Sequence, residues 1–313
     1  MISRLHSSRA LKVYPIRFER AFERKCERMD FFRPTSIAEA LSLLSEHDGA
    51  RCLAGGATLV AMMNAGLIEP AQLISLADLS ELSGICALND GSVRIGAMTR
   101  HAETAQSRAF KGGQKVLAEA AGKIANVPIR NMGTIGGSLA FADPAADYLP
   151  ALATLDAVIE TASKRGKRTL ALTEFIVDWY TTALEPDEII TSVLVPPVSE
   201  SSIGVFEKLE RTGGDYAIAS VACILLVDDD VCTEARVAIG ACAPGPIRRQ
   251  AAERLLEGPS LTDDKVRVAG KILANACDPV DDVRGSAEYR RLVVPRLVAK
   301  AITAARSDPG GRS

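Results

Sequence analysis

The segment NMGTIGGSLAFADPAADYLPAL, residues 131–152, places adjacent glycines in a short bend and follows them with a run of residues typical of a helix. Adjacent glycines permit positive φ and leave successive backbone N–H groups without a covering Cβ. Such N–H groups bind phosphate oxygens well, above all where a helix starts. The bend therefore predicts a point where the backbone comes very close to a ligand.

A second bend of this kind lies earlier in the chain, in LAGGATLV at residues 53–60. Thr58 and Thr134 stand beside the two glycine pairs and can add hydroxyl donors. A diphosphate held between both segments would need no lysine. Either segment alone is also what an ordinary turn looks like. The chain has neither the G-x-x-x-x-G-K-[ST] spacing of a P-loop nor a G-x-G-x-x-G after the first strand, so a Rossmann site is disfavoured.

The composition is that of an ordinary globular protein. The 313 residues suggest about two domains, and 47% of them are hydrophobic and 24% charged. A net charge of −2 and only 4% aromatic residues argue against nucleic acid as a partner. No apolar run approaches the roughly 20 residues that span a bilayer, so we expect no integral membrane segment.

The cysteines are odd in number and include no Cys-x-x-Cys pair. This pattern argues against a disulfide framework and against a zinc or iron–sulfur site in this chain, so no metal ligands are predicted. Scattered cysteines with apolar neighbours are typical of reduced core residues, which indicates a cytoplasmic protein. They are Cys26, Cys52, Cys86, Cys223, Cys232, Cys242 and Cys277.

Residues 1–28 differ from the rest, with eight Lys or Arg against three Glu and no apolar segment. The absence of an apolar segment excludes a secretory signal peptide, and the interleaved acids argue against a transit peptide. We expect the folded domain to begin at Met29 and residues 1–28 to be disordered or a mis-called start.

Capping residues and hydrophobic periodicity predict most of the elements. Ser36 and Glu39 have the spacing of a capping box. Asn126 and Pro128 are expected to end one helix, and Asp143-Pro144 to begin another. Helices are predicted at 37–48, 58–66, 115–125, 145–155, 248–256, 263–276 and 288–305. Strands are predicted at 51–54, 72–76, 92–96, 157–161, 168–172, 188–195, 205–209, 218–227 and 233–242, the last three as an antiparallel meander.

Five segments, in this order, closely resemble the FAD-binding (medium) subunits of the molybdenum hydroxylase family, of the carbon monoxide dehydrogenase and xanthine dehydrogenase type. They are AGGATLVAMMNAGLIEPAQLISL, IGAMTRHAE, NMGTIGGSLAFADPAADYLPAL, FEKLERTGGDYAIASVA and GSAEYRRLVVPRLVAKAI. The resemblance covers about residues 29–306. It implies an α+β fold, with a vanillyl-alcohol-oxidase-type (PCMH-type) FAD-binding domain of two α/β subdomains, 29–85 and 86–202. A C-terminal domain of a three-stranded antiparallel sheet and helices, 203–306, would follow.

The resemblance also implies which residues hold FAD. Asp147 matches a carboxylate that bonds FAD's sugar-like hydroxyls, Ile124 a position in the adenine or ribose pocket, and Ile190 and Lys208 positions near the isoalloxazine. The residues implied for the diphosphate are Leu53, Ala54, Gly55, Gly56, Ala57, Thr58, Leu59 and Val60, with Thr134, Ile135, Gly136, Gly137 and Ser138. Ala57 departs from the family, where His, Thr or Asn is common, so one polar contact is expected to be missing.

Each of these positions also has a plainer interpretation. Asp143 and Asp147 could both be helix-start residues stabilised by the helix dipole; we favour capping for Asp143 and cofactor contact for Asp147. Ile124 could belong to a helix core, and Lys208 could be a solvated lysine on an edge strand. A cation at Lys208 would stabilise the negative reduced flavin. Arg211 and Asp215 could form a supporting ion pair.

The function that the resemblance implies is electron transfer. A large subunit with a molybdenum cofactor would oxidise the substrate, a small subunit with [2Fe–2S] clusters would carry the electrons, and FAD on this chain would pass them to an external acceptor. A dimer of heterotrimers would result, and no catalytic side chain is expected here. The alternatives are a self-contained FAD-dependent reductase or oxidase of the same fold and a scaffold protein that has lost FAD.

Overall fold

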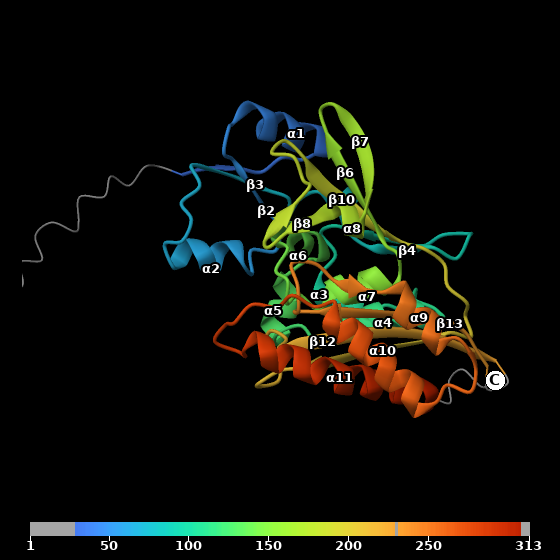
Figure 1. The fold of residues 1–313 in the computed structure, drawn as a ribbon. Helices are drawn as coiled ribbons and strands as arrows, with labels where there is room; N and C mark the ends of the chain where they lie inside the picture. Colours follow the sequence, from blue (N-terminus) through green and yellow to red (C-terminus); the bar gives the residue numbers. More distant parts are fainter. Residues whose placement is uncertain (1–28, 229–230, 308–313) are drawn as a thin grey trace, which may run out of the picture.

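Three larger β-sheets follow one another along the chain in the computed structural model (Figure 1). The structure describes residues 29–228 and 231–307, so the extension predicted for residues 1–28 lies outside the described residues. The mixed α+β architecture implied by the sequence is confirmed, with an antiparallel sheet and helices in the C-terminal part.

The first sheet is parallel, with strand order β1-β3-β2. Ser36 caps α1 as predicted, because its Oγ accepts a hydrogen bond from the Glu39 amide at 3.2 Å. Helix α2 buries none of its residues and projects away from the rest of the chain in Figure 1. The elements of this unit are β1 (Asp30–Phe32), α1 (Ile37–Glu46), β2 (Arg51–Leu53), α2 (Leu59–Asn64) and β3 (Gln72–Ser75).

The second sheet is antiparallel, with strand order β4-β5-β10-β6-β7. Alternate residues such as Ile95, Ile159 and Val193 are fully buried and pack against helices, which forms the central core. Its strands are β4 (Ile85–Ala87), β5 (Val93–Gly96), β6 (Val158–Ser163), β7 (Gly166–Ala171) and β10 (Ile189–Val195), and a small hairpin pairs β8 (Ile176–Asp178) with β9 (Thr181–Thr182). The helices are α3 (His101–Gln106), α4 (Lys115–Gly122), α5 (Val127–Met132), α6 (Ile135–Phe141), α7 (Tyr148–Thr154) and α8 (Leu172–Phe175).

The third sheet is the predicted meander, extended by two short strands. Helices α10 and α11 pack together and α11 covers β11 and β12, while α4 and α7 lie on the side of the second unit (Figure 1). The elements are β11 (Ile203–Leu209), β12 (Ala219–Asp228), β13 (Val231–Gly240), β14 (Ile247–Arg248), α9 (Gln250–Leu256), β15 (Gly258–Pro259), α10 (Asp263–Asn275) and α11 (Ala287–Ser307).

Two predicted helix boundaries are wrong. Asn126 and Pro128 do not end a helix but begin α5, because the Asn126 side chain accepts from the Ile129 amide at 3.1 Å and proline fits a first helical turn. Asp143 does not cap a helix that starts at 145, since its Oδ1 accepts from the Ala145 amide at 2.9 Å within a turn and α7 begins only at Tyr148.

Among the described residues, we find no helix with both the length and the apolar character needed to cross a bilayer.

Phe206 joins the third sheet to the second unit. Its side chain is fully buried in the central core, although β11 belongs to the C-terminal sheet. We expect Phe206→Ala to lower the free energy of unfolding by about 3–5 kcal/mol, because it removes a large packed ring. Val227→Ala on β12, where the side chain is 39% exposed, is the control and should cost less than about 1 kcal/mol. Equal losses in urea denaturation would contradict this assignment.

Candidate functional site

The two glycine segments meet in space. A Cβ added at Gly55 would lie 1.8 Å from the carbonyl oxygen of Met132 and 3.1 Å from Gly133 Cα, so only glycine fits there. A Cβ added at Gly137 would lie 3.6 Å from Ala54 Cβ. The segment 53–60 therefore lies directly against the segment 132–138, as a ligand shared by both would require.

The first segment presents free donors. Within the part of the chain that the structure describes, the backbone N–H groups of residues 55 to 58 have no acceptor. Gly56 adopts φ +77°, the left-handed conformation that glycine tolerates at no steric cost. Consecutive free N–H groups beside a helix start are suited to an anion such as a diphosphate.

The second segment does not match our expectation of free backbone donors. Thr134 is the N-cap of α6, and its Oγ1 accepts from the Gly137 amide at 3.1 Å. The Ile135 amide donates to the Thr99 carbonyl oxygen and the Gly136 amide to that of Ala97, while the Ser138 amide bonds within the helix. These four N–H groups are used inside the protein, so the amide part of the prediction is wrong for residues 135–138.

Gly136 instead allows close packing. A Cβ at Gly136 would lie 2.6 Å from Ala97 Cβ and 2.7 Å from the Ala97 carbonyl oxygen, so α6 rests directly on the backbone after β5. His101 supports the same segment, because a Cβ at Gly133 would lie 2.5 Å from His101 Nε2. The glycines of this segment thus set the distance between α6, Ala97 and His101.

Asp147 and Lys208 form a buried ion pair. Lys208 Nζ lies 2.9 Å from Asp147 Oδ2, and the side chains are 2% and 5% exposed. Lys208 is therefore not the solvated edge-strand lysine of the plainer interpretation. Asp147 occupies the N-cap position of α7 but makes no capping bond with its side chain. Its Oδ1 is buried without any hydrogen-bond partner among the described residues.

Lys208 is surrounded by acceptors. Besides Asp147, its Nζ lies 3.1 Å from Glu210 Oε2 and donates to the Lys123 carbonyl oxygen at 3.1 Å. Burial raises the pKa of Asp147 to about 7, against the opposing effect of the Lys208 ammonium. The Asp147 carboxyl therefore exchanges its proton near neutral pH. Burial also raises the pKa of Asp143.

The roles of the remaining positions, Ile124 and Ile190, stay predictions. Ile124 follows α4, is half-buried, and its carbonyl oxygen accepts from Arg130 at 2.7 Å. Ile190 on β10 is 4% exposed within the central core. The expected pair of Arg211 and Asp215 is wrong: Asp215 pairs with Arg284 at 3.4 Å, and Arg211 donates to a backbone carbonyl.

His101 contacts Tyr148 in the structure. Their Nδ1 and hydroxyl oxygen are 3.1 Å apart, although the residues are 47 positions apart in the chain. Burial lowers the pKa of His101 to about 4, with the charge of Arg130 contributing, so the ring is neutral. No local pattern links two residues at such a separation, so sequence reasoning could not have found this contact.

A cavity of about 650 Å³ lies apart from these residues. Arg94, Glu160 and Ser192 line it from the face of the second sheet opposite the central core. None of the described residues predicted to hold the cofactor lines it. Among the described residues, no group of three or more His, Cys, Asp or Glu side chains could hold a metal ion.

Two observations indicate that the residues of the predicted site are suited to binding FAD. The free N–H groups at residues 55–58 can donate to diphosphate oxygens, and the unpartnered Asp147 Oδ1 can accept from a cofactor hydroxyl. Lys208 adds a buried cation next to that oxygen. The second glycine segment would contribute contact area and the Thr134 hydroxyl rather than free backbone donors.

Comparison with known proteins gives a consistent result. A model described as the FAD binding domain in molybdopterin dehydrogenase matches residues 24–198, and one for the CO dehydrogenase flavoprotein C-terminal domain matches residues 204–305. The 6-hydroxypseudooxynicotine dehydrogenase complex subunit alpha of Paenarthrobacter nicotinovorans is 36% identical, over 88% of this chain and 95% of that protein. The carbon monoxide dehydrogenase medium chain of Hydrogenophaga pseudoflava is 34% identical, over 89% and 97%. A structure of carbon monoxide dehydrogenase from Hydrogenophaga pseudoflava, lacking the Mo-pyranopterin moiety of its cofactor, superposes with a TM-score of 0.85 at 33% identity, over 90% and 98%.

The packing of Gly136 can be tested without any ligand. We expect Gly136→Val to lower the free energy of unfolding by about 1–3 kcal/mol, because the new side chain collides with Ala97. Gly122→Ala is the matched control, since its Cβ would meet only Ala105 Cβ at 3.9 Å. Thermal unfolding of the FAD-free proteins measures both, and an unchanged melting temperature for Gly136→Val would refute the packing role.

The raised pKa of Asp147 predicts a pH effect. The folded protein keeps the Asp147 proton up to about pH 7, whereas the unfolded chain loses it near the ordinary aspartate pKa of 3.8. The contribution of Asp147 to the free energy of unfolding is therefore fully present below about pH 4. It is lost as the pH rises from there through 7. Relative to Asp147→Asn, FAD-free wild type should lose about 2–4 kcal/mol between pH 4 and 8. Urea denaturation across this range tests it, with exposed Asp263→Asn as control; parallel curves for wild type and Asp147→Asn would exclude the shift.

Proposed function

Because the chain belongs to the family of FAD-binding medium subunits of molybdenum hydroxylases, of the carbon monoxide dehydrogenase and xanthine dehydrogenase type, we propose that it takes electrons from the [2Fe–2S] clusters of a partner subunit and passes them to an external acceptor. The observation that carries this proposal is the buried Asp147–Lys208 pair with its unpartnered oxygen, and the contact between the two glycine segments supports it.

We propose that different residues of the predicted site bind different parts of FAD. The N–H groups of residues 55–58 donate to the diphosphate, and Asp147 Oδ1 accepts from a hydroxyl of the cofactor. FAD, when bound, supplies the redox chemistry, since it exchanges electrons singly or in pairs. Ile124 and Ile190 are proposed to line the two ends of its site.

Lys208 tunes the site through its charge. Its ammonium is 2% exposed, so water screens it little and its field acts at close range. Asp147, Glu210 and the Lys123 carbonyl oxygen fix the position of Nζ. A fixed buried cation stabilises negative charge that develops beside it, which favours the reduced cofactor.

The clusters and the molybdenum cofactor are proposed to lie on partner chains. The sequence has no Cys-x-x-Cys pair, whereas cluster ligation requires grouped cysteines. The medium chain of Hydrogenophaga pseudoflava is, by its name, one chain of several in carbon monoxide dehydrogenase. We propose that this chain joins a small [2Fe–2S] subunit and a large molybdenum subunit as a dimer of heterotrimers in the cytoplasm.

Affinity purification of the tagged full chain from its source tests this. We expect a yellow complex with FAD equimolar to this chain, and iron and molybdenum on two co-purifying proteins. A chain that purifies alone with FAD and reduces an acceptor unaided would instead establish a self-contained reductase or oxidase. A colourless chain that takes up no added FAD would remove both flavin functions and leave a scaffold.

Lys208→Gln should lower the midpoint potential of bound FAD. Glutamine keeps a hydrogen-bond donor for Asp147 but removes the charge. Loss of a charged interaction of about 1.5–3 kcal/mol corresponds to roughly 30–60 mV for a two-electron couple. Lys208→Arg retains the charge and is the matched control. Spectroelectrochemical titration of the holoprotein measures the shift, and an unchanged potential in Lys208→Gln would remove the proposed role.

A further inference from the structure

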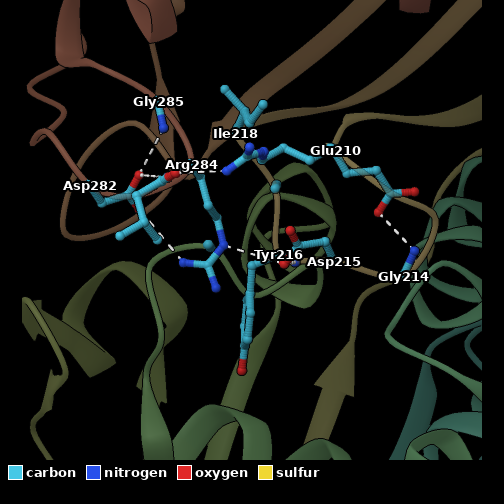
Figure 2. A network of polar contacts seen from close by, with 12 residues as sticks. Glu210, Gly214, Asp215, Tyr216, Ile218, Asp282, Arg284 and Gly285 are labelled. Atoms are coloured by element: carbon cyan, nitrogen blue, oxygen red, sulfur yellow. Dashed lines mark hydrogen bonds and ion pairs between the residues drawn. The ribbon is translucent and has the colours of Figure 1, made fainter.

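The segment from Lys208 to Ala217 connects the buried ion pair to the protein surface. Glu210 Oε2 lies 3.1 Å from Lys208 Nζ. It also accepts from the Gly214 amide at 3.2 Å (Figure 2). One carboxylate oxygen therefore links the buried cation to the turn at residues 211–214. A movement of this turn would move the acceptor that fixes Lys208.

The turn rests on the end of helix α4. Gly214 adopts φ +86°, and a Cβ there would lie 2.5 Å from the Ala125 carbonyl oxygen, so only glycine fits. Ala125 adjoins Ile124, the position proposed to line the adenine or ribose pocket. The segment thus contacts the backbone on both sides of Ile124, at Lys123 and Ala125.

Arg284 holds the outer end of the same segment (Figure 2). Its Nε lies 3.4 Å from Asp215 Oδ1, and its guanidinium carbon lies 5.0 Å from the ring centroid of Tyr216. Asp215 Oδ1 also accepts from the Tyr216 amide at 2.7 Å. Burial raises the pKa of Tyr216 to about 12, and the charge of Asp143 contributes.

The backbone of Arg284 is held in place by buried residues. Asp282 Oδ1 accepts from the Arg284 amide at 2.8 Å and from Arg290 Nη2 at 2.6 Å. Arg290 is 4% exposed and donates to the carbonyl oxygens of Ile218 and Ala241 at 2.6 and 3.0 Å. Arg284 therefore connects a fixed backbone to this segment, which is also held by the Glu210–Gly214 contact and by Arg211, whose Nη1 donates to the Val283 carbonyl oxygen at 2.9 Å.

We propose that Arg284 is a positioning residue for the cofactor site: by holding Asp215 and Tyr216 it fixes segment 210–217, and through Glu210 it fixes Lys208. The inference rests on the proposed function, because it requires FAD beside Lys208. Arg284 itself touches neither the ion pair nor the glycine segments and acts through the segment. At 30% exposure, its contacts contribute little to global stability, so its loss should leave the fold intact.

The test uses the purified holoenzyme complex and measures both the dissociation constant of FAD and its midpoint potential. We expect Arg284→Ala to weaken FAD binding about fivefold, the scale of one exposed ion pair plus one cation–π contact, and to lower the potential. Tyr216→Ala should have a similar effect, and the double variant should add little, because both changes release the same segment. Arg284→Lys should restore part of the effect, since lysine can pair with Asp215 but lacks the planar group.

Arg267→Ala is the matched control, because Arg267 forms an exposed ion pair with Asp264 on α10. It should leave both quantities unchanged. Wild-type affinity and potential in Arg284→Ala and Tyr216→Ala, with FAD lost in Asp147→Asn, would overturn the positioning role alone. Retention of FAD with unchanged affinity in Asp147→Asn would instead remove the proposed cofactor site. If Arg284→Ala lowers the melting temperature but leaves the midpoint potential of FAD unchanged, Arg284 has a structural role only and the positioning role is wrong.

Discussion

The buried ion pair between Asp147 and Lys208 is the constraint on which the rest of the site depends. Removing two charges from water costs several kcal/mol per ion, and their attraction repays this only when every polar atom is satisfied. Here Asp147 Oδ1 is not satisfied by any described residue. Stability alone does not explain such a pair, whereas a ligand that donates to this oxygen does.

The fold brings the two charges together from separate units. Asp147 lies at the start of α7, which packs between the second and third sheets, and Lys208 lies on β11 of the third sheet. The glycine segments approach from the first sheet and from α6. No single unit contains the site, so its geometry depends on how the three sheets pack on one another.

Long elements with regular periodicity could be predicted from the sequence, and short ones could not. The meander and the last three helices follow their hydrophobic patterns, whereas α5 and α6 are short and begin with the residues that usually end helices or form turns. The roles of Asp147 and Lys208 at the cofactor site were predicted from the family resemblance and not from their spacing. Spacing alone could not pair Asp215 with Arg284, which lie 69 positions apart.

The edge of β11 is covered by side chains rather than by another strand. Glu119 Oε2 accepts from the Phe206 amide at 2.9 Å, and Lys123 Nζ donates to the Phe206 carbonyl oxygen, both from the α4 region. An exposed strand edge is a template for pairing with other chains. The α4 region thus occupies part of one edge of the C-terminal sheet, which lowers the tendency of this edge to pair with a strand of another chain.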